Sequence, residues 1–403
     1  MRTTNVSALL VAVGIIVAAI IYLDSSKAAK TPATSVPVVS VALSTATTVP
    51  ASSQEKTAKP AEPPTLSLKE MRYERAKELT TPDGFINTST GSVQAPITIG
   101  QFIGKKVVLL DIWTYSCINC QRTLPYLKAW WEKYKDKGLM IIGLHTPEFE
   151  FEKKYENVLA AVEKFGITYP VALDNDYSTW RAYRNQYWPR KYLIDIDGYI
   201  VYDHIGEGGY EETERQIQKV LAERMERLGK KDGVALPVTK ESAAARPESP
   251  ETYFGAFRNE NFGNGARGTI GEQTLAATEE VNRNTFYLVG DWNITREYAE
   301  NKNANAQILF KYKARDVYFV ASSEKGVRAA LYLDGGMLKG KGASAYACRL
   351  QGFCGGEDVS ANGTVFIKED RLYKLIQHDG IEEHTLKIEI ESPGLKAFTF
   401  TFG

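Results

Sequence analysis

Two cysteines separated by two residues, Cys117 and Cys120, offer the clearest chemistry in this sequence. They lie in the stretch WTYSCINCQRTLP, where an apolar run gives way to a helical pattern. At a helix N-terminus, free amide groups and the helix dipole favour a thiolate, which is the species that attacks disulfides. A second thiol one helical turn later can release the resulting mixed disulfide. The spacing therefore predicts a redox pair in which Cys117 is the nucleophile and Cys120 the resolving thiol.

Three other uses of a C-x-x-C pair are less well supported by the sequence. A zinc site needs two more soft ligands, and Cys348 and Cys354 fall in what looks like another domain. Haem attachment needs a histidine directly after the second cysteine, where Gln121 stands. A structural disulfide stays open, although so short a loop stabilises little through chain entropy. We expect neither a metal nor a cofactor at this pair.

The residues around the pair alternate between strand-like and helix-like patterns. Apolar runs at 106–113 and 139–144 are typical of strands buried on both faces. The other predicted elements are strands at 169–173, 191–195 and 199–204, a turn at 197–198, and helices at 69–79, 153–165 and 211–228. Such an alternation, ending in a hairpin and a helix, predicts an α/β domain with a mixed central sheet over residues 67–228.

A polar, proline-containing linker at 229–250 separates this domain from a region with a different pattern, 251–403. The second region has short β-rich runs divided by Gly, Asn and Asp turns, at 308–312, 316–321, 329–333, 364–367, 372–376, 384–390 and 397–402. Because no convincing helix accompanies these runs, they predict an all-β sandwich.

The amino-acid composition argues against two classes of protein. The chain has 403 residues with 49 basic and 49 acidic side chains, so it lacks the electrostatic footprint of a nucleic-acid-binding protein. Four cysteines are too few for a disulfide-built scaffold. For Cys348 and Cys354 we expect a local structural disulfide, with unpaired thiols or a second redox pair as alternatives. His378 and His384 look too isolated in the sequence to predict a metal site.

The N-terminus predicts where the protein resides. Residues 6–23 are an uncharged apolar run, close to the ~20 residues that a membrane-spanning helix needs. The run is longer than the roughly 7–15 apolar residues of a cleaved signal peptide, although cleavage near 26–28 stays open. We expect a signal-anchor over 1–24, with the N-terminus inside, and a disordered Pro/Ser/Thr/Ala tether over 25–66. The body of the protein then lies on the extracytoplasmic face, periplasmic or outer, where disulfides persist.

Four features around the cysteine pair resemble the active site of the thioredoxin superfamily. Asp111 stands six residues before Cys117, where these proteins often carry a buried acid. Trp113 matches the Trp that they have four residues before the nucleophile. Pro125 matches the proline that kinks their active-site helix, and the segment WPRKYLID around Pro189 resembles the one that holds their cis-proline beside the disulfide. The resemblance implies a thioredoxin-like fold.

Within the superfamily the chain is similar to the membrane-tethered extracytoplasmic branch (TlpA, ResA) and to the C-terminal region of DipZ-type proteins. The phrase WTYSCINCQRTLPYL, the segment HTPEFEFE from 145 to 152, and the terminal FTFG carry this resemblance, which covers 85–403. It implies a β domain like carbohydrate-binding modules, with a glycan or a protein as ligand, and a membrane electron donor of the DsbD or CcdA type. Two departures count: this chain has a single apolar span, and Thr123 replaces the Glu that TlpA-type proteins often carry.

The resemblance also implies roles for individual residues. Asp111, if buried near Cys120, can take and return the proton of the second thiol, with desolvation raising its pKa; a strand Asp held by local hydrogen bonds is the alternative. A cis Pro189 would pack against the sulfurs and let the backbone of Trp188 pair with a substrate strand.

Three more positions are candidates for substrate binding or tuning of the site: Trp113, His145 and Glu148. For the last two, a loop held by local hydrogen bonds is the alternative. A peroxiredoxin-type peroxidase fits poorly, because its motif needs a proline where Leu110 stands.

Two functional hypotheses remain. The first is an anchored thiol–disulfide oxidoreductase that reduces or exchanges disulfides in exported proteins, with cytochrome c maturation as one pathway. Because no histidine lies between the two cysteines, we expect a reducing pair, with a potential below about −150 mV. The second is a cell-envelope binding protein whose β domain grips a glycan or a protein and whose C-x-x-C is structural.

Overall fold

The computed structural model describes residues 68–88, 95–230, 233–234, 237–240, 247–340 and 353–403. The predicted anchor (1–24) and tether (25–66), together with Cys348, lie outside these ranges. Among the described residues, no helix is both long and apolar enough to cross a membrane. The anchor and the localisation that follows from it therefore stay predictions.

The first domain is built on a six-stranded mixed sheet with the strand order β1-β4-β3-β2-β5-β6. The strands are β1 (Gly84–Ile86), β2 (Val107–Trp113), β3 (Leu139–His145), β4 (Val171–Leu173), β5 (Arg190–Ile194) and β6 (Ile200–Ile205). The three central strands β2, β3 and β4 run parallel, and their neighbours are antiparallel. Every residue of β2 and β3 is buried, as the continuous apolar runs predict. The thioredoxin-like α/β fold is confirmed.

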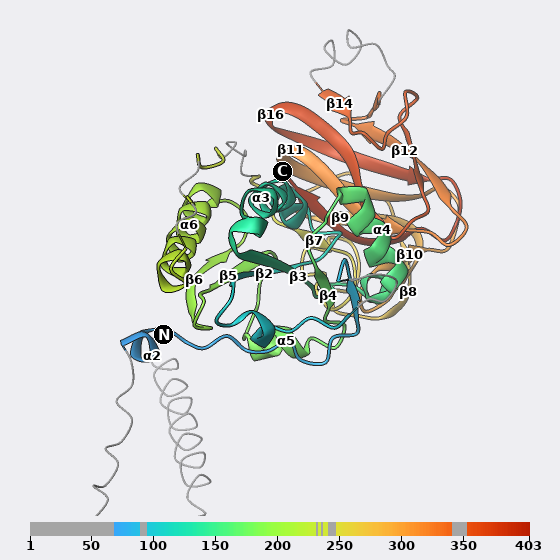
Figure 1. Ribbon diagram of the computed structural model, residues 1–403. Coiled ribbons are helices and arrows are strands. Elements are labelled where there is room, and N and C mark those ends of the chain that lie inside the picture. Colours follow the sequence, from blue (N-terminus) through green and yellow to red (C-terminus); the bar gives the residue numbers. More distant parts are fainter. Residues whose placement is uncertain (1–67, 89–94, 231–232, 235–236, 241–246, 341–352) are drawn as a thin grey trace, which may run out of the picture. The chain divides into compact units, whose positions relative to one another are not determined.

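Helices cover both faces of this sheet (Figure 1). They are α2 (Leu68–Arg72), α3 (Ile118–Tyr134), α4 (Tyr155–Phe165), α5 (Ser178–Ala182) and α6 (Tyr210–Arg227). Apolar side chains of α3, α4 and α6 share one core with β2 and β3. A second core lies on the opposite face of the sheet. It contains residues that precede β2, such as Leu79 and Ile97, and Tyr183, which follows α5.

Two local predictions about this domain are wrong. The first helix ends at Arg72 and does not reach residue 79. Beyond it, the backbone of Glu74 accepts a hydrogen bond from the amide of Ile200, and Arg75 forms a bridge with Tyr199. Backbone pairing with the β6 hairpin thus replaces helical bonds. The short helix α5 was not predicted from the sequence, because five residues give too short a pattern.

The second domain is all-β, as predicted, and its strands form an eleven-stranded antiparallel sheet. The strands are β7 (Thr252–Tyr253), β8 (Gly271–Leu275), β9 (Phe286–Ile294), β10 (Ala299–Asn301), β11 (Ala306–Ser322), β12 (Val327–Leu333), β13 (Gly336–Met337), β14 (Phe353–Gly355), β15 (Thr364–Ile367), β16 (Arg371–Ile390) and β17 (Lys396–Phe402). Two pairs of predicted strands are each one long strand, β11 and β16, with irregular register where the sequence suggested a break. The sheet closes over one continuous apolar core.

The two domains share part of the core of the redox domain. Tyr318, Val320, Leu372 and Phe398 of the β domain belong to the same apolar cluster as both cysteines. The ring of Phe398 contacts two aromatic residues that follow β3, Phe149 and Phe151, at centroid distances of 5.1 and 4.8 Å. The β domain therefore lies directly against the loops that surround the cysteine pair.

Candidate active site

Cys117 caps the N-terminus of the helix that carries the resolving cysteine. Its backbone is extended (φ −78°, ψ 118°), and its Sγ accepts a hydrogen bond from the amide of Cys120 at 3.3 Å. Both cysteines are free thiols, and Cys117 is only 9% exposed while Cys120 is 1% exposed. Burial and the neighbouring Cys117 sulfur raise the pKa of Cys120 well above its usual value. The second thiol therefore needs a nearby base before it can attack.

Asp111 is a candidate for that base. It is 1% exposed on β2, and its Oδ1 has no hydrogen-bond partner. Burial raises the pKa of Asp111 to about 6, although the Lys191 cation acts in the opposite direction. The charge of Asp111 in turn contributes to the raised pKa of Cys120, so the two groups interact. The prediction of a buried acid near Cys120 is confirmed.

Lys191 is a feature of this site that sequence reasoning did not identify. It lies on β5 directly opposite Asp111 in the antiparallel register, so both side chains are on the same face of the sheet. The side chain is fully buried and donates one hydrogen bond, to the carbonyl of Gly206 at 3.3 Å. Burial lowers the pKa of Lys191, and Asp111 opposes that effect. A single lysine within a predicted apolar strand is the sequence signal that could have indicated that Lys191 belongs to the site.

Gly143 lets aromatic side chains approach the backbone next to Asp111. Gly143 on β3 pairs with Asp111 across the parallel strands, and a Cβ at Gly143 would come within 3.0 Å of the indole nitrogen of Trp113. The same Cβ would lie 3.3 Å from Tyr169. The Trp113 indole nitrogen and the Tyr169 hydroxyl are both buried without hydrogen-bond partners. A side chain at residue 143 would therefore crowd these aromatic groups beside Asp111.

Glu152 fixes the turn that carries the nucleophile, and sequence reasoning did not assign it a role. The side chain is completely buried, and its Oε1 accepts hydrogen bonds from the amide and the hydroxyl of Ser116 at 3.2 and 2.7 Å. Its Oε2 accepts from the amides of Glu148 and Phe149 at 2.5 and 3.0 Å. Burial raises the pKa of Glu152, and the Glu148 charge adds to this effect. The segment HTPEFEFE contains Glu152, but its partners become visible only in the fold.

The loop after β6 forms another side of the site. Arg122, two residues after Cys120, makes a two-point ion pair with Glu207, with nitrogen–oxygen distances of 2.7 and 3.0 Å. The same guanidinium donates to the side-chain oxygen of Asn119 at 2.7 Å. Asn119, one of the two residues between the cysteines, is therefore held by Arg122, which is itself fixed by the ion pair with Glu207.

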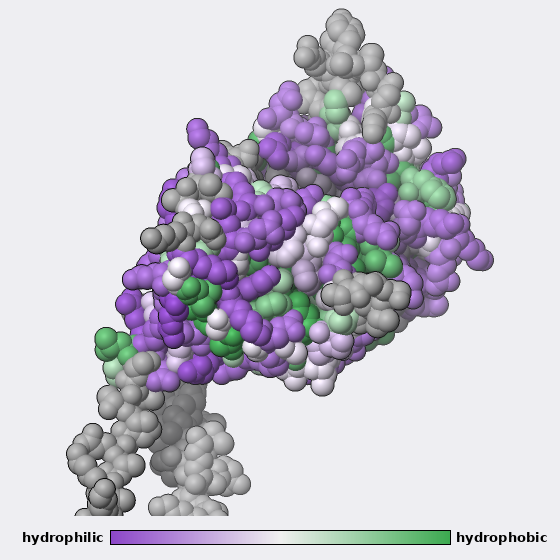
Figure 2. Space-filling view, viewed as in Figure 1, coloured by the Kyte–Doolittle hydropathy of each residue, from purple (hydrophilic) through white to green (hydrophobic). Residues whose placement is uncertain are grey.

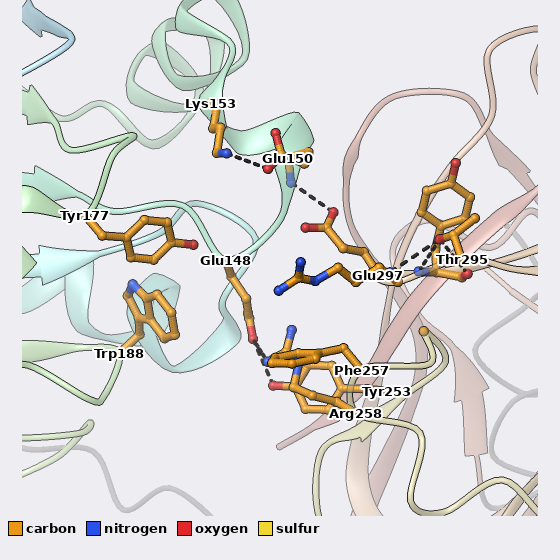
Figure 3. Close-up of a pocket in the computed structure, with 13 residues that line it drawn as sticks. Glu148, Glu150, Lys153, Tyr177, Trp188, Tyr253, Phe257, Arg258, Thr295 and Glu297 are labelled. Carbon is orange, nitrogen blue, oxygen red and sulfur yellow. Dashed lines mark hydrogen bonds and ion pairs between the residues drawn. The ribbon is translucent and has the colours of Figure 1, made fainter. Parts of the chain in front are cut away.

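The peptide bond between Trp188 and Pro189 is cis, as the resemblance implies. The packing of Pro189 against the sulfurs stays a prediction. The Trp188 indole donates to the carbonyl of Thr146 at 3.0 Å. Trp188 also lines a cavity of about 760 Å³ between the two domains, with Tyr177 and Glu148 on the redox side and Phe257 on the β side (Figure 3).

Glu148 links the redox domain to the β domain. Arg258 donates to Glu148 Oε1 at 2.7 Å, and the hydroxyl of Tyr253 donates to the same oxygen at 2.9 Å. The Arg258 guanidinium lies 3.6 Å from the centre of the Tyr253 ring (Figure 3). Glu148 thus joins the β domain to the loop whose amides bind Glu152. It also lines the cavity between the two domains.

The predicted substrate contacts of Trp113 and His145 are wrong. Trp113 is 1% exposed and His145 is fully buried, so neither side chain can reach a protein substrate. Their rings pack edge to face at 5.3 Å, and His145 also stacks on Tyr115 at 5.7 Å. Burial lowers the pKa of His145 to about 3, so it is a neutral packing residue behind the site.

In the β domain, Cys354 forms a disulfide. Its expected partner Cys348 lies outside the described residues, so that pairing stays a prediction. Phe254 and Trp292, two aromatic residues of the β domain, are fully buried, so neither can stack on a sugar at the surface. The face of the protein seen in Figure 2 is largely hydrophilic, with separate apolar areas.

Comparison with known families agrees with this geometry. Residues 75–221 match the Redoxin family, and residues 249–403 match the family described as thioredoxin like C-terminal domain. The two domains thus match two separate families, and neither match supports the resemblance of the β domain to carbohydrate-binding modules.

The chain is also similar to individual proteins. Protein DipZ of Mycobacterium tuberculosis is 34% identical over 336 residues, which cover 80% of this chain and 43% of DipZ. The chain thus spans less than half the length of that relative. The thiol-disulfide oxidoreductase ResA of Bacillus thuringiensis is 33% identical over 115 residues, covering 28% of this chain and 64% of ResA. A solved thioredoxin-like protein in its oxidised form is 27% identical, covers 38% of this chain and 97% of its own, and has a TM-score of 0.34.

Proposed function

We propose that this chain is a membrane-anchored, extracytoplasmic thiol–disulfide oxidoreductase that reduces or exchanges disulfides in exported proteins. The observation that carries the proposal is the pair of free thiols at the start of α3, with Cys117 as the helix cap and Asp111 buried near Cys120. The similarity to ResA, named a thiol-disulfide oxidoreductase, supports the same activity. The apolar run at 6–23 supports the anchor and the compartment.

The reaction transfers two electrons from the dithiol to a substrate disulfide. The Cys117 thiolate attacks one substrate sulfur, which breaks the substrate disulfide and releases the other substrate sulfur as a thiolate that takes up a proton. Cys120 then gives its proton to Asp111 and attacks the Cys117 sulfur. This step forms the Cys117–Cys120 disulfide and releases the second substrate thiol, protonated from Asp111 or solvent.

Partners follow from this electron balance. The oxidised pair must be reduced again by a dithiol donor, and a membrane reductase of the DsbD or CcdA class fits an anchored protein. Apocytochromes c are one class of disulfide-containing substrate. The cavity beside Trp188 is lined by both domains, which supports a protein ligand there. A glycan ligand has less support, because Phe254 and Trp292 cannot stack on a sugar from inside the core.

A trapping experiment tests the proposal. With Cys120→Ser, the second step is blocked, so Cys117 should accumulate mixed disulfides with substrate proteins that reductant releases. Cys117→Ser is the matched control and should trap nothing. The wild-type protein should reduce insulin disulfides and show a potential below about −150 mV against glutathione.

Two results would count against the proposal. If the wild-type protein leaves insulin intact and Cys120→Ser traps no protein, the C-x-x-C is structural and the chain is a binding protein. If the potential is at or above about −150 mV, the pair is an oxidant and the direction of electron flow is reversed.

A further inference from the structure

Three side chains of the β domain converge far from the cysteine pair. They are His378, Glu382 and His384, all on the long strand β16. The expectation that the two histidines are isolated is wrong, because their rings stack with a centroid distance of 4.7 Å and an interplanar angle of 23°. One ligand atom from each of the three residues lies within 4.8 Å of the others.

An irregularity in the strand register brings these residues together. Between two paired positions, Ala314↔Glu382 and Asp316↔Gln377, β11 advances by two residues while β16 advances by five. The extra residues of β16 bulge out of the ladder, and His378, Glu382 and His384 lie on the same face of the strand because even numbers of residues separate them. Bulges are often found where a strand must re-aim a side chain toward a site.

The distances suit a transition-metal ion. Glu382 Oε2 lies 3.1 Å from His384 Nε2 and 3.8 Å from His378 Nδ1. Ligand atoms around tetrahedral zinc, each about 2.1 Å from the metal, are roughly 3.4 Å apart. The two measured separations lie on either side of that value, and the ligand nitrogens of the two histidines lie within 4.8 Å of each other.

The other nitrogen of each histidine has the partner that a metal ligand needs. The Nε2 of His378 lies 2.7 Å from the hydroxyl of Tyr312, and the Nδ1 of His384 lies 2.6 Å from Asp334 Oδ2. Asp334 is itself held, because its Oδ1 accepts the amide of Thr385 at 2.8 Å. Such outer hydrogen bonds fix the ring orientation and the tautomer of ligating histidines. Each ring thus directs its remaining nitrogen toward Glu382.

We propose that His378, Glu382 and His384 bind a divalent transition-metal ion, with zinc as the best-suited metal. Two imidazoles and one carboxylate are ligands that zinc favours, while calcium and magnesium prefer oxygen ligands alone. With these three ligands from the described residues, a tetrahedral ion has a fourth position that another ligand can fill. Glu382 is 38% exposed in its side chain, so the ion has access from solvent. This site is separate from the proposed redox activity.

Calorimetric titration of the full-length chain with Zn²⁺ tests the proposal. The active-site dithiol is kept oxidised throughout, so that Cys117 and Cys120 cannot bind the ion. We expect one equivalent of zinc to bind. Glu382→Gln and His384→Asn should each weaken binding at least tenfold, and Asp334→Asn should weaken it by about 10–100-fold through the lost outer hydrogen bond.

A matched control is available in the adjacent residue. Glu383 is an exposed acid that pairs with Lys311 and Arg283 and does not belong to the cluster. Glu383→Gln should therefore bind zinc like the wild-type protein. Co²⁺ titration gives a second readout, since the visible bands of tetrahedral Co²⁺ should appear in the wild type and in Glu383→Gln but not in Glu382→Gln.

Two results overturn the site. One is a wild-type protein that binds no zinc, in which case the cluster is only a histidine held between two carboxylates. The other is zinc binding that survives both Glu382→Gln and His384→Asn, because the ion is then bound elsewhere. Glu382→Gln changes a partly exposed side chain and is expected to fold, so the test does not depend on the more buried histidines.

Discussion

Replacing Asp111 with asparagine should make the protein more stable at neutral pH while slowing disulfide reduction. Asparagine has nearly the same shape as aspartate but carries no charge, so it removes a buried carboxylate without leaving a cavity. The side chain is 1% exposed, and solvent therefore does little to screen its charge. The same substitution takes away the group that we propose accepts the proton of Cys120, whose pKa burial raises.

The size of the stability change follows from the pKa of Asp111, which burial raises from 3.8 to about 6. Between these values the folded protein still holds a proton that the unfolded chain has released. Stability therefore falls as pH rises, and the loss is complete once pH exceeds the folded pKa. A shift of roughly two units corresponds to about 3 kcal/mol at about pH 7.5 and to less than about 1 kcal/mol at about pH 4. The attraction of Lys191 is already contained in the folded pKa.

Urea unfolding of both reduced proteins at about pH 4 and about pH 7.5 checks this reasoning. The advantage of Asp111→Asn over the wild type should grow by about 2 kcal/mol between the two conditions. Turnover of insulin should fall, with the mixed disulfide accumulating. Asp203→Asn, which changes an exposed carboxylate paired with Arg190, is the control and should alter stability by less than about 1 kcal/mol. An advantage that is equal at both pH values, or a loss of stability at about pH 7.5, would refute the argument.

Two further substitutions test the surroundings of the site. Glu152→Gln should lower the free energy of unfolding by about 1–3 kcal/mol and slow insulin reduction, because an amide in place of one oxygen leaves a buried donor such as the Ser116 amide unpaired. Chemical denaturation and turnover measure the two effects, and unchanged values would show that the carboxylate does not hold the turn. Gly143→Ala should lower the free energy of unfolding in urea by about 1–3 kcal/mol, because the new methyl group meets Trp113 at 3.0 Å. Gly233→Ala, where no atom lies within 4 Å, is the control and should be neutral, so equal effects of the two would contradict the packing argument.

Much of the redox domain was predictable from the sequence, because its signals are local or follow a short period. Continuous apolar runs identified β2 and β3, since strands buried on both faces need apolar residues at every position. The position of Cys117 at the start of a helix follows from the change of pattern within a few residues. Asp111 and Pro189 were found through the resemblance to thioredoxins. Asp111 is buried and the peptide bond before Pro189 is cis, as that resemblance implies.

The roles of Trp113 and His145 were mispredicted for a physical reason. Each is the last residue of a buried strand, at the edge of the sheet that carries the cysteine pair, and such positions often face a ligand. In this protein the β domain covers that edge with Phe398 and Asp370, whose carbonyl accepts a hydrogen bond from Tyr115 at 3.0 Å. A domain that docks on the loops of another turns residues expected at the surface into core.

What the sequence by itself determined is the dithiol, the two fold classes and the order of the elements, because spacing and periodicity are properties of neighbouring residues. Only the tertiary structure placed Lys191 opposite Asp111, joined Glu152 to the turn before Cys117, and gathered the histidine cluster on β16. Each of these depends on strand register, on a bulge or on a loop closing over a long separation. Buried polar groups need hydrogen-bond or ionic partners, and in these cases the partner is distant in the sequence. The pattern of neighbouring residues therefore does not indicate which partner it is.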